Sequence, residues 1–302
     1  MIENIPKVSV VIVTFNRPDY VPLAIQSVLD QTFQDFEIIV VDNGIEKPAE
    51  SIVKKFNDAR IKYLPQVENT GCSGGKNVGI KSAQGEYVAF LDDDDVWLPE
   101  KLELQIEVLE KASSDTGFCF TAITEVRDKG EINSQVPGGE DDYFEFALRK
   151  FKGFLSSTLV IKRDVFEEVG LLSEDFPSHT DIDLIIRITK KYRGVAINKP
   201  LIRMCLKSNH EQMGSSYKRR IVGRHLLLDK YREDFEKRPL ILSKHLMLLA
   251  KFYRNDGQYK EARKMFLKTF KTYFRPVALM HYISLLFNGL GYRLFKFIKR
   301  LF

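Results

Sequence analysis

Short apolar runs alternate with amphipathic segments in the first third of the chain. Residues 8–13, 36–41 and 87–91 are rich in β-branched and aromatic side chains and are too short for helices, so we expect three buried strands. Apolar residues recur at helical spacing over residues 21–29, and a further helix is predicted around residues 77–83. Strands that alternate with helices predict a parallel, doubly wound sheet.

The pattern becomes mixed after Trp97. Residues 98–111 and 179–192 have helical spacing, whereas residues 118–126 and 157–161 have the composition of strands. We therefore expect an α/β fold, with a mixed sheet flanked by helices.

Beyond about residue 217 the chain is predicted to be almost entirely helical. Residues 240–254, residues 258–273 and a segment from residue 277 onward are separated by Asn-Asp-Gly and by a proline. We expect a first domain over residues 1–216 and a helical region over residues 217–302. Some apolar positions have tetratricopeptide-like spacing: Leu249, Ala250, Tyr253, Ala262 and Phe266. A single repeat cannot form a solenoid, so a helical hairpin packed on the first domain is favoured over a repeat module.

Polar side chains follow three of the predicted strands. Thr14, Asp42 and Asp92 each lie where a strand ends, and ligands of such sheets bind beyond the carboxyl ends of the strands. Asp92 opens a run of four aspartates, whose mutual repulsion a divalent cation would relieve. Oxygen ligands suit Mg²⁺ or Mn²⁺, and Mg²⁺ often completes its coordination with substrate phosphates. The alternative is a solvated acidic loop that caps the following helix.

Two further segments carry candidate chemistry. Residues 71–77 (GCSGGKN) form a glycine-rich segment that is not a Walker A motif, because Thr70 stands where that motif requires glycine. Either a flexible loop or an anion-facing helix start fits this segment. The helix predicted from residue 179 has Asp181 and Asp183 in its first turn. Acidic residues favour helix N-termini, and the alternative is that one of them acts as a general base.

Composition narrows the class of protein further. The chain has 302 residues, of which 44% are hydrophobic, so it can bury a sizeable core. Residues 1–7 contain no apolar h-region and lead directly into the first predicted strand, so we expect no secretory signal. Three scattered cysteines favour reduced thiols in a cytosol. The net charge of the chain is +5, and residues 262–302 contribute +9 of it through nine Lys or Arg and no acid. Residues 1–261 therefore carry −4, a charge distribution unlike that of a uniformly basic nucleic-acid-binding protein.

The order of several motifs over residues 8–217 resembles glycosyltransferase family 2, whose members have the GT-A fold. The motifs are VSVVIVTFNR, EIIVVDNG, NTGCSGGKNVGI, YVAFLDDDDVWLPEKL, VIKRDVFEEVGLLSEDF and HTDIDLIIRI. The resemblance implies a Rossmann-like mixed sheet and an inverting transfer of sugar from a nucleotide-diphosphate sugar, with uridine as the favoured nucleoside, to a glycan or lipid-linked glycan.

The resemblance also implies roles for individual residues. Thr14 and Asn16 would line the nucleotide pocket, and Asp42 would contact a uracil-type base. The DxD motif corresponds to Asp92 and Asp94, with Asp94 as the favoured direct ligand of Mn²⁺ or Mg²⁺ and with Asp92 or Asp93 nearer the ribose. The metal would stabilise the departing nucleoside diphosphate.

Asp181 corresponds to the family's catalytic base, which would deprotonate the acceptor hydroxyl in a single displacement. Thr180 replaces the glutamate that commonly precedes it, so Asp183 stays an alternative. Lys76 stands where the family usually has an arginine near the nucleotide and keeps the charge without bidentate geometry. His210 lies where some relatives contact the metal or the diphosphate, and a structural role is the alternative.

The C-terminal residues predict a membrane partner. On a helical wheel, residues 290–302 separate apolar and aromatic side chains from Arg293, Lys296, Lys299 and Arg300. Such helices lie in membrane interfaces, so we expect a cytoplasmic enzyme that is peripheral on the inner face of the cell membrane and uses a polyprenyl-linked acceptor. The alternative is a helix docked on its own domain.

Two other classes of protein remain open. A nucleotidyltransferase would use the same sheet, acids and cation but would release pyrophosphate and would not need a base at Asp181. A degenerate, non-catalytic scaffold on the membrane would not need the intact acids.

Overall fold

The computed structural model describes residues 5–149, 154–206 and 216–286. The chain divides into two compact units. The first comprises Met1–Glu174 and Thr180–Glu211, and the second comprises Asp175–His179 and Gln212–Phe302. The predicted domains, residues 1–216 and 217–302, stay a prediction, because a compact unit is not by itself shown to be an independently folding domain.

The first unit is built on a ten-stranded mixed sheet with the order β3-β2-β1-β4-β9-β6-β10-β5, in which β7 pairs with β6 and β8 with β10. Strands β3, β2, β1 and β4 are parallel, and β9 runs antiparallel to both β4 and β6. The strands are β1 (Val8–Thr14), β2 (Phe36–Asp42), β3 (Ile61–Pro65), β4 (Tyr87–Asp92), β5 (Asp95–Trp97), β6 (Thr116–Arg127), β7 (Gly130–Asn133), β8 (Gly139–Asp141), β9 (Val160–Lys162) and β10 (Arg193–Cys205). The predicted mixed α/β fold is confirmed.

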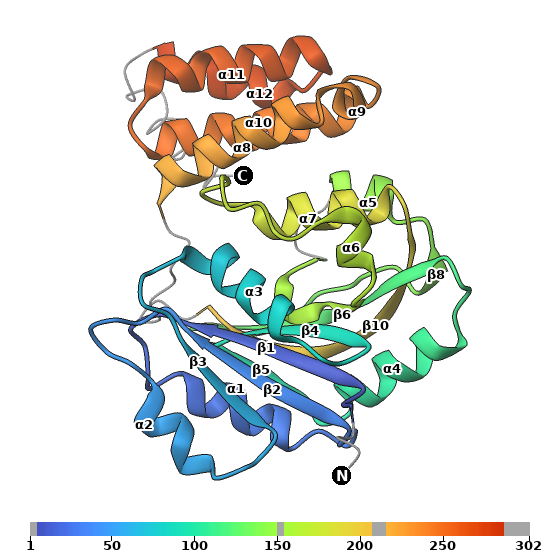
Figure 1. Ribbon diagram of the computed structural model, residues 1–302. Helices are drawn as coiled ribbons and strands as arrows, with labels where there is room; N and C mark the ends of the chain where they lie inside the picture. Colours follow the sequence, from blue (N-terminus) through green and yellow to red (C-terminus); the bar gives the residue numbers. More distant parts are fainter. Residues whose placement is uncertain (1–4, 150–153, 207–215, 287–302) are drawn as a thin grey trace. The chain divides into compact units, whose positions relative to one another are not determined.

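Helices flank this sheet, and Figure 1 shows α1 and α2 on one face with α3 on the other. The helices of the first unit are α1 (Val21–Leu29), α2 (Glu50–Val53), η1 (Lys54–Phe56), α3 (Gly71–Ser82), α4 (Lys101–Lys111), α5 (Phe144–Arg149), η3 (Ser156–Thr158), α6 (Val165–Val169) and α7 (Thr180–Thr189). Because β1, β2 and β4 are parallel, the polar side chains at their carboxyl ends lie at one edge of the sheet.

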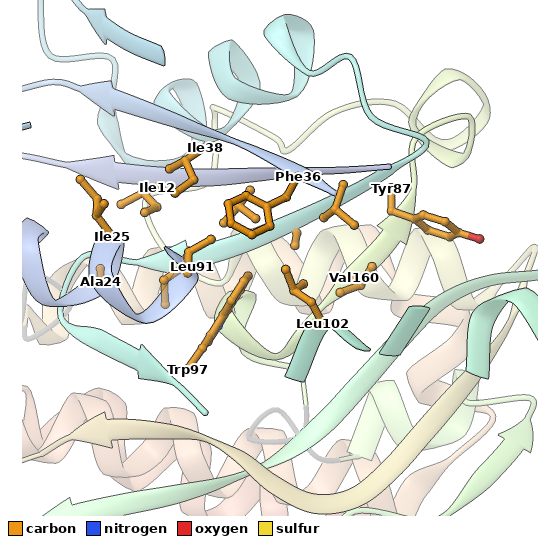
Figure 2. Packing of buried hydrophobic residues seen from close by; sticks show 14 of the residues in the cluster. Ile12, Ala24, Ile25, Phe36, Ile38, Tyr87, Leu91, Trp97, Leu102 and Val160 are labelled. Carbon is orange, nitrogen blue, oxygen red and sulfur yellow. The ribbon is translucent and has the colours of Figure 1, made fainter. Parts of the chain in front are cut away.

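The main core lies between one face of this sheet and helices α1 and α4. Alternate residues of β1, β2 and β4 face it, and Figure 2 shows Ile12, Ile38 and Leu91 directed toward Ile25 and Trp97. Burying a side chain of this size contributes about 1.5–3 kcal/mol, and this apolar contact fixes the register of the three strands.

Helix α3 decides between the two interpretations of residues 71–77 and extends the helix predicted around residues 77–83. It begins at Gly71, so the glycine-rich segment forms its first turns. A Cβ at Gly75 would come within 2.7 Å of Val13, and one at Gly79 within 2.2 Å of Val11. The glycines are therefore required because α3 packs directly against β1, and the alternative of a helix start at this position is the correct one.

Two parts of the sheet differ from the sequence-based expectation. Residues 156–158 form the buried 3₁₀ helix η3 rather than the start of a strand, and β9 begins only at Val160. Strand β10 was not predicted, because Asn198, Lys199 and Pro200 interrupt its apolar pattern. Its pairing with β6 has register shifts on either side of Pro200, which let the strand accommodate a residue without an amide hydrogen.

The second unit is helical in its described part. It contains α8 (Tyr217–Lys230), α9 (Arg232–Glu236), α10 (Pro239–Asn255), α11 (Tyr259–Thr272) and α12 (Pro276–Leu286). Helices α10 and α11 form the predicted hairpin around a turn at Gly257, whose φ is 80°, and share a core that includes Ala250, Ala262 and Phe266. Among the described residues, none of the helices combines the length and apolar character needed to cross a membrane.

Lys101 is a buried cation in the core of the first unit. Its side chain is 0% exposed, its Nζ lies 3.8 Å from the Trp97 ring centroid, and it donates a hydrogen bond of 2.6 Å to Gln105. Burial lowers the pKa of Lys101 from 10.5 to about 7. The unfolded chain therefore binds more protons than the folded protein between these two pH values, and stability rises with pH across that window.

We expect the Lys101→Met variant to lose this pH dependence. From pH 7 to pH 9 the parent protein should gain roughly 2 kcal/mol in free energy of unfolding from Lys101, and the variant should not. Urea unfolding of both proteins at the two pH values measures the difference. An equal gain in both proteins would show that Lys101 is not the group responsible.

Candidate active site

The four consecutive aspartates lie where β4 gives way to β5. Asp92 is the last residue of β4 and Asp95 the first of β5, so Asp93 and Asp94 form the turn between the two strands. This turn follows directly from β4, the strand that pairs with β1 in the parallel part of the sheet. We call residues 92–95 the acid loop.

Arg17 and Thr14 hold the central acid of this loop. Asp93 is 2% exposed, its Oδ2 accepts a 2.8 Å hydrogen bond from Thr14 Oγ1, and its Oδ1 is paired with Arg17. Arg17 also lies 3.3 Å from Asp94 Oδ2. Burial raises the pKa of Asp93 to about 7, against the opposing effect of Arg17. The sequence prediction missed Arg17, although its place three residues beyond β1 at the same sheet edge could have indicated it.

Lys76 joins the acid loop to the start of α7. Its Nζ lies 3.3 Å from Asp92 Oδ1 and 3.4 Å from Asp181 Oδ1, and it donates to Ser156 Oγ. Lys76 is 3% exposed. Burial alone would lower the pKa of Lys76, but the two carboxylates outweigh that effect and raise it well above its ordinary value. The cation therefore stays charged between two predicted site acids that are far apart in the sequence.

Ser157 fixes the geometry of the acid loop. Its Oγ accepts a 3.1 Å hydrogen bond from the Asp92 amide and donates one of 2.6 Å to Asp95 Oδ2. Trp97 Nε1 in turn donates to the Ser157 carbonyl at 3.0 Å. Burial and the neighbouring Asp92 raise the pKa of Asp95 well above its ordinary value. The sequence prediction missed Ser157 as well, because its segment has the composition of an ordinary strand.

The two acids at the start of α7 have different surroundings. Asp183 is 0% exposed, and its Oδ2 accepts hydrogen bonds from Ser173 at 2.7 Å and from Arg187 at 3.1 Å. Asp181 keeps 30% of its side chain exposed. A general base must reach the proton that it removes, and of the two acids Asp181 is the accessible one. Its role as the base stays a prediction.

Two of the residues predicted to contact the nucleotide, Asn16 and Asp42, hold the segments that follow β1 and β2. Asn16, with a φ of 52°, accepts through Oδ1 from the amides of Glu46 and Lys47 at 3.2 Å each. Asp42 is 1% exposed, and it accepts from the Gly44 amide at 2.7 Å, from the Ala49 amide at 2.6 Å and from the Tyr63 hydroxyl at 2.6 Å. Both carboxylate oxygens of Asp42 thus already shape this loop, and its contact with a base stays a prediction.

The acid loop fits a divalent cation in its donor chemistry. Asp92 and Asp94 keep 43% and 20% of their side chains exposed and offer oxygen ligands, which Mg²⁺ and Mn²⁺ prefer. Burial, Asp181 and Asp94 raise the pKa of Asp92, against the effect of Lys76, so a bound cation would favour its ionised form. Within residues 5–149, 154–206 and 216–286, no three His, Cys, Asp or Glu side chains form a metal-binding group. Further ligands would have to come from water and a diphosphate.

His210 is the one predicted site residue that lies outside the described residues. Of the other eight, Asp92, Asp181 and Lys76 meet directly through ion pairs. Thr14, Asp93 and Asp94 meet around Arg17, whereas Asn16 and Asp42 shape the loops that follow β1 and β2.

Solved structures with this fold include enzymes of sugar transfer. The S. aureus TarS fragment 1–349 in complex with UDP-GlcNAc has a TM-score of 0.62 at 19% identity, and the match covers 95% of this chain and 91% of that one. The mannosyltransferase PcManGT from Pyrobaculum calidifontis, in complex with GDP-Man and Mn²⁺, has a TM-score of 0.59 at 16% identity, covering 97% and 84%. The fold is therefore that of the GT-A glycosyltransferases.

The sequence then identifies the family. Residues 9–170 match the model of glycosyl transferase family 2, and the chain belongs to this family. An uncharacterized glycosyltransferase of Methanocaldococcus jannaschii is 30% identical over 206 residues, which cover 62% of this chain and 71% of that protein.

Other relatives match over shorter shares of their length. An uncharacterized glycosyltransferase of Rickettsia felis is 30% identical over 194 residues, 61% of this chain but 32% of that protein. The chain thus spans about a third of the length of its Rickettsia felis, Rickettsia conorii and Rickettsia bellii relatives. The Escherichia coli UDP-Glc:alpha-D-GlcNAc-diphosphoundecaprenol beta-1,3-glucosyltransferase WfgD is 36% identical over 104 residues, 34% of this chain and 41% of that protein.

Proposed function

We propose that this protein is an inverting glycosyltransferase that moves a sugar from a nucleoside-diphosphate sugar to a hydroxyl group. The observation that carries the proposal is the position of Lys76, between Asp92 of the acid loop and Asp181 of α7. This contact brings the candidate donor-binding acids and the candidate base into one constellation, which is the arrangement that a single displacement requires.

The residues would divide the reaction between them. Asp181 accepts the proton of the attacking hydroxyl as that oxygen bonds to the anomeric carbon, and the bond from this carbon to the diphosphate breaks, which inverts the configuration. Lys76, held by Asp92, places a positive charge beside both acids. Asp94 and Asp92 would hold Mn²⁺ or Mg²⁺, which supplies Lewis-acid stabilisation to the leaving diphosphate.

The proposed donor is a uridine-diphosphate sugar. TarS is solved with UDP-GlcNAc, and the name of WfgD specifies UDP-Glc. Incubating the protein with Mn²⁺ and UDP-, GDP- or dTDP-sugars, and measuring nucleoside diphosphate release, tests donor and reaction class together. We expect release from a UDP-sugar. A protein that instead makes pyrophosphate from UTP and a sugar 1-phosphate would be a nucleotidyltransferase, and absence of both activities would support the scaffold alternative.

The proposed acceptor is a glycan carried on a polyprenyl lipid, in the synthesis of a cell-surface polysaccharide or glycoconjugate. WfgD is named for a diphosphoundecaprenol-linked acceptor. We propose that the protein meets such an acceptor on the cytoplasmic face of the membrane. The predicted amphipathic segment, residues 290–302, lies outside the described residues. Helix α12, which precedes it in the sequence, exposes the apolar side chains of Val277, Met280 and Ile283 at three-residue spacing.

Deletion of residues 288–302 should abolish binding to anionic vesicles and leave donor hydrolysis within about twofold. The predicted site residues all precede this segment, and the basic side chains supply an attraction that salt screens over about 8 Å at physiological ionic strength. Flotation with vesicles of phosphatidylglycerol and phosphatidylcholine at low and high salt measures the binding. If the truncated protein loses its cooperative thermal transition, the segment packs on its own domain and the membrane proposal fails.

A further inference from the structure

A buried cation in the helical unit holds the segment that leads into α7. Arg224, on α8, is 1% exposed, and its Nη2 donates to His179 Nε2 at 2.8 Å. Its Nη1 donates to His245 Nδ1 at 3.0 Å, and the guanidinium lies over the Phe252 ring at 6.0 Å. Two imidazoles, one from the segment before α7 and one from α10, therefore accept hydrogen bonds from this arginine.

The hydrogen bonds of this cluster have one consistent assignment of donors and acceptors. Arginine can only donate, so His179 accepts at Nε2 and carries its proton on Nδ1. That Nδ1–H donates to Ser178 Oγ at 2.7 Å, and the Ser178 hydroxyl donates to the Arg219 carbonyl at 3.1 Å. Burial and the neighbouring Arg224 lower the pKa of His179 to about 3, so the neutral form that this chain of hydrogen bonds needs persists at physiological pH.

Helix α8 contacts this segment along its length. Arg219 Nε donates to the Pro177 carbonyl at 3.1 Å, and the Lys230 ammonium lies 5.4 Å from the Phe176 ring centroid. A Cβ at Gly223 would lie 2.4 Å from Ser178 Oγ, so only glycine permits this approach. Residues 175–179 therefore pack against α8, in agreement with their assignment to the second unit.

His179 is also conformationally strained. Its φ is 68°, in the left-handed region, which residues other than glycine adopt uncommonly and at a cost in free energy. The next residue, Thr180, begins α7, and Asp181 lies in the first turn. The contacts of the imidazole thus hold a strained backbone position two residues before the proposed base.

We propose that Arg224 is a positioning residue for the transfer reaction: by holding His179, it fixes the first turn of α7 and with it Asp181. This inference rests on the proposed role of Asp181 as the base. Without Arg224, His179 loses the hydrogen bond at its Nε2, the first turn of α7 unwinds, and the Asp181 carboxylate leaves its position beside Lys76.

Amide hydrogen exchange tests the conformational step without any substrate. The amides of Leu184 and Ile185 donate to the carbonyls of Thr180 and Asp181 in a regular helix. In the Arg224→Met variant, a peptide that covers residues 180–189 should exchange about tenfold faster or more, while one that covers β1 stays unchanged. His245→Phe is the matched control, since it removes the other imidazole and should leave both peptides as in the parent. Unchanged exchange in residues 180–189 overturns the proposal.

Rate measurements test the catalytic consequence, with UDP-GlcNAc or UDP-Glc as donor and water as acceptor. Arg224→Met should lower kcat by about 10–100-fold and leave the KM of the donor within about twofold, because only the base is displaced. His179→Asn, which keeps a residue that tolerates positive φ but cannot reach Arg224, should have the same effect. If Arg224→Met does not fold, His179→Asn alone tests the positioning role.

The double variant Arg224→Met with His179→Asn should be no slower than either single variant, because both changes act through one contact. If the loss of kcat in the double variant equals the sum of the two single losses, the proposal is overturned. It is also overturned if kcat of the control His245→Phe falls in step with its thermal stability, because the effect of Arg224 would then be one of general stability. If Asp181→Asn leaves hydrolysis unchanged, the proposed base is wrong instead. If Asp181→Asn abolishes hydrolysis and Arg224→Met does not, the failure belongs to the positioning role alone.

Discussion

Replacing Asp181 by Asn should lower the rate of donor turnover by roughly 10²–10⁴-fold while the affinity for UDP stays within about twofold. Asparagine keeps the shape of the side chain but cannot accept the proton of the attacking hydroxyl. The carboxylate of Asp181 is partly exposed beside Lys76, so the change should not disturb the core. Release of UDP from a UDP-sugar measures turnover, and calorimetry measures UDP affinity.

Asp183→Asn is the matched control for this prediction. Asp183 is fully buried between Ser173 and Arg187, so its loss should lower the melting temperature and affect turnover only in proportion to the folded fraction. If Asp183→Asn folds but has little turnover while Asp181→Asn stays active, the base is Asp183 and not Asp181.

Removing the divalent cation, or the acid that is proposed to bind it, should weaken UDP binding on the order of 10²-fold. A metal between carboxylates and a diphosphate neutralises charges that would otherwise repel, and a 10²-fold loss of affinity corresponds to about 2.8 kcal/mol. In the Asp94→Ala variant, Arg17 also loses one of its two carboxylate partners in the acid loop. Calorimetric titration of UDP into the parent protein with Mn²⁺, into the parent with EDTA, and into Asp94→Ala with Mn²⁺ compares the three affinities.

Asp35→Ala serves as the control, since this exposed acid precedes β2 at the opposite end of the strand from Asp42. It should bind UDP as the parent does. Equal UDP affinity of the parent in Mn²⁺ and in EDTA would remove the metal from the proposal and leave Arg17 and Lys76 as the cations available to the diphosphate.

Strands β1, β2 and β4 could be predicted because they are buried on both faces. Predominantly apolar runs such as residues 8–13 and 36–41 have no other stable place in a domain of this size. Strand β10 lacked that signal, since its polar centre and its bulges are stabilised by pairing with β6, a contact that is distant in sequence. Local pattern carries no information about such pairing.

The candidate site shows the same limit. The aspartates could be predicted because four adjacent carboxylates at a strand end repel one another, and a bound cation relieves that repulsion. Ser157 could not, because its role comes from what the fold places opposite it: its hydroxyl binds both ends of the acid loop. For Arg17 the only signal was its place beyond β1, and its contact with Asp93 and Asp94 comes from the fold. An isolated arginine or serine is common in any sequence.

The tight enclosure of Lys76 has a consequence for the evolution of the family. The resemblance to the family implies arginine at this position in many relatives, and arginine needs more room than lysine. Lys76 is 3% exposed, with Ser156 directly against its ammonium. Adding volume to a packed site is destabilising unless a neighbour becomes smaller. Positions 76 and 156 should therefore covary: homologues with lysine should keep serine at position 156, and homologues with arginine should have glycine or alanine there. The size of residue 156 would then indicate whether a homologue has lysine or arginine at position 76.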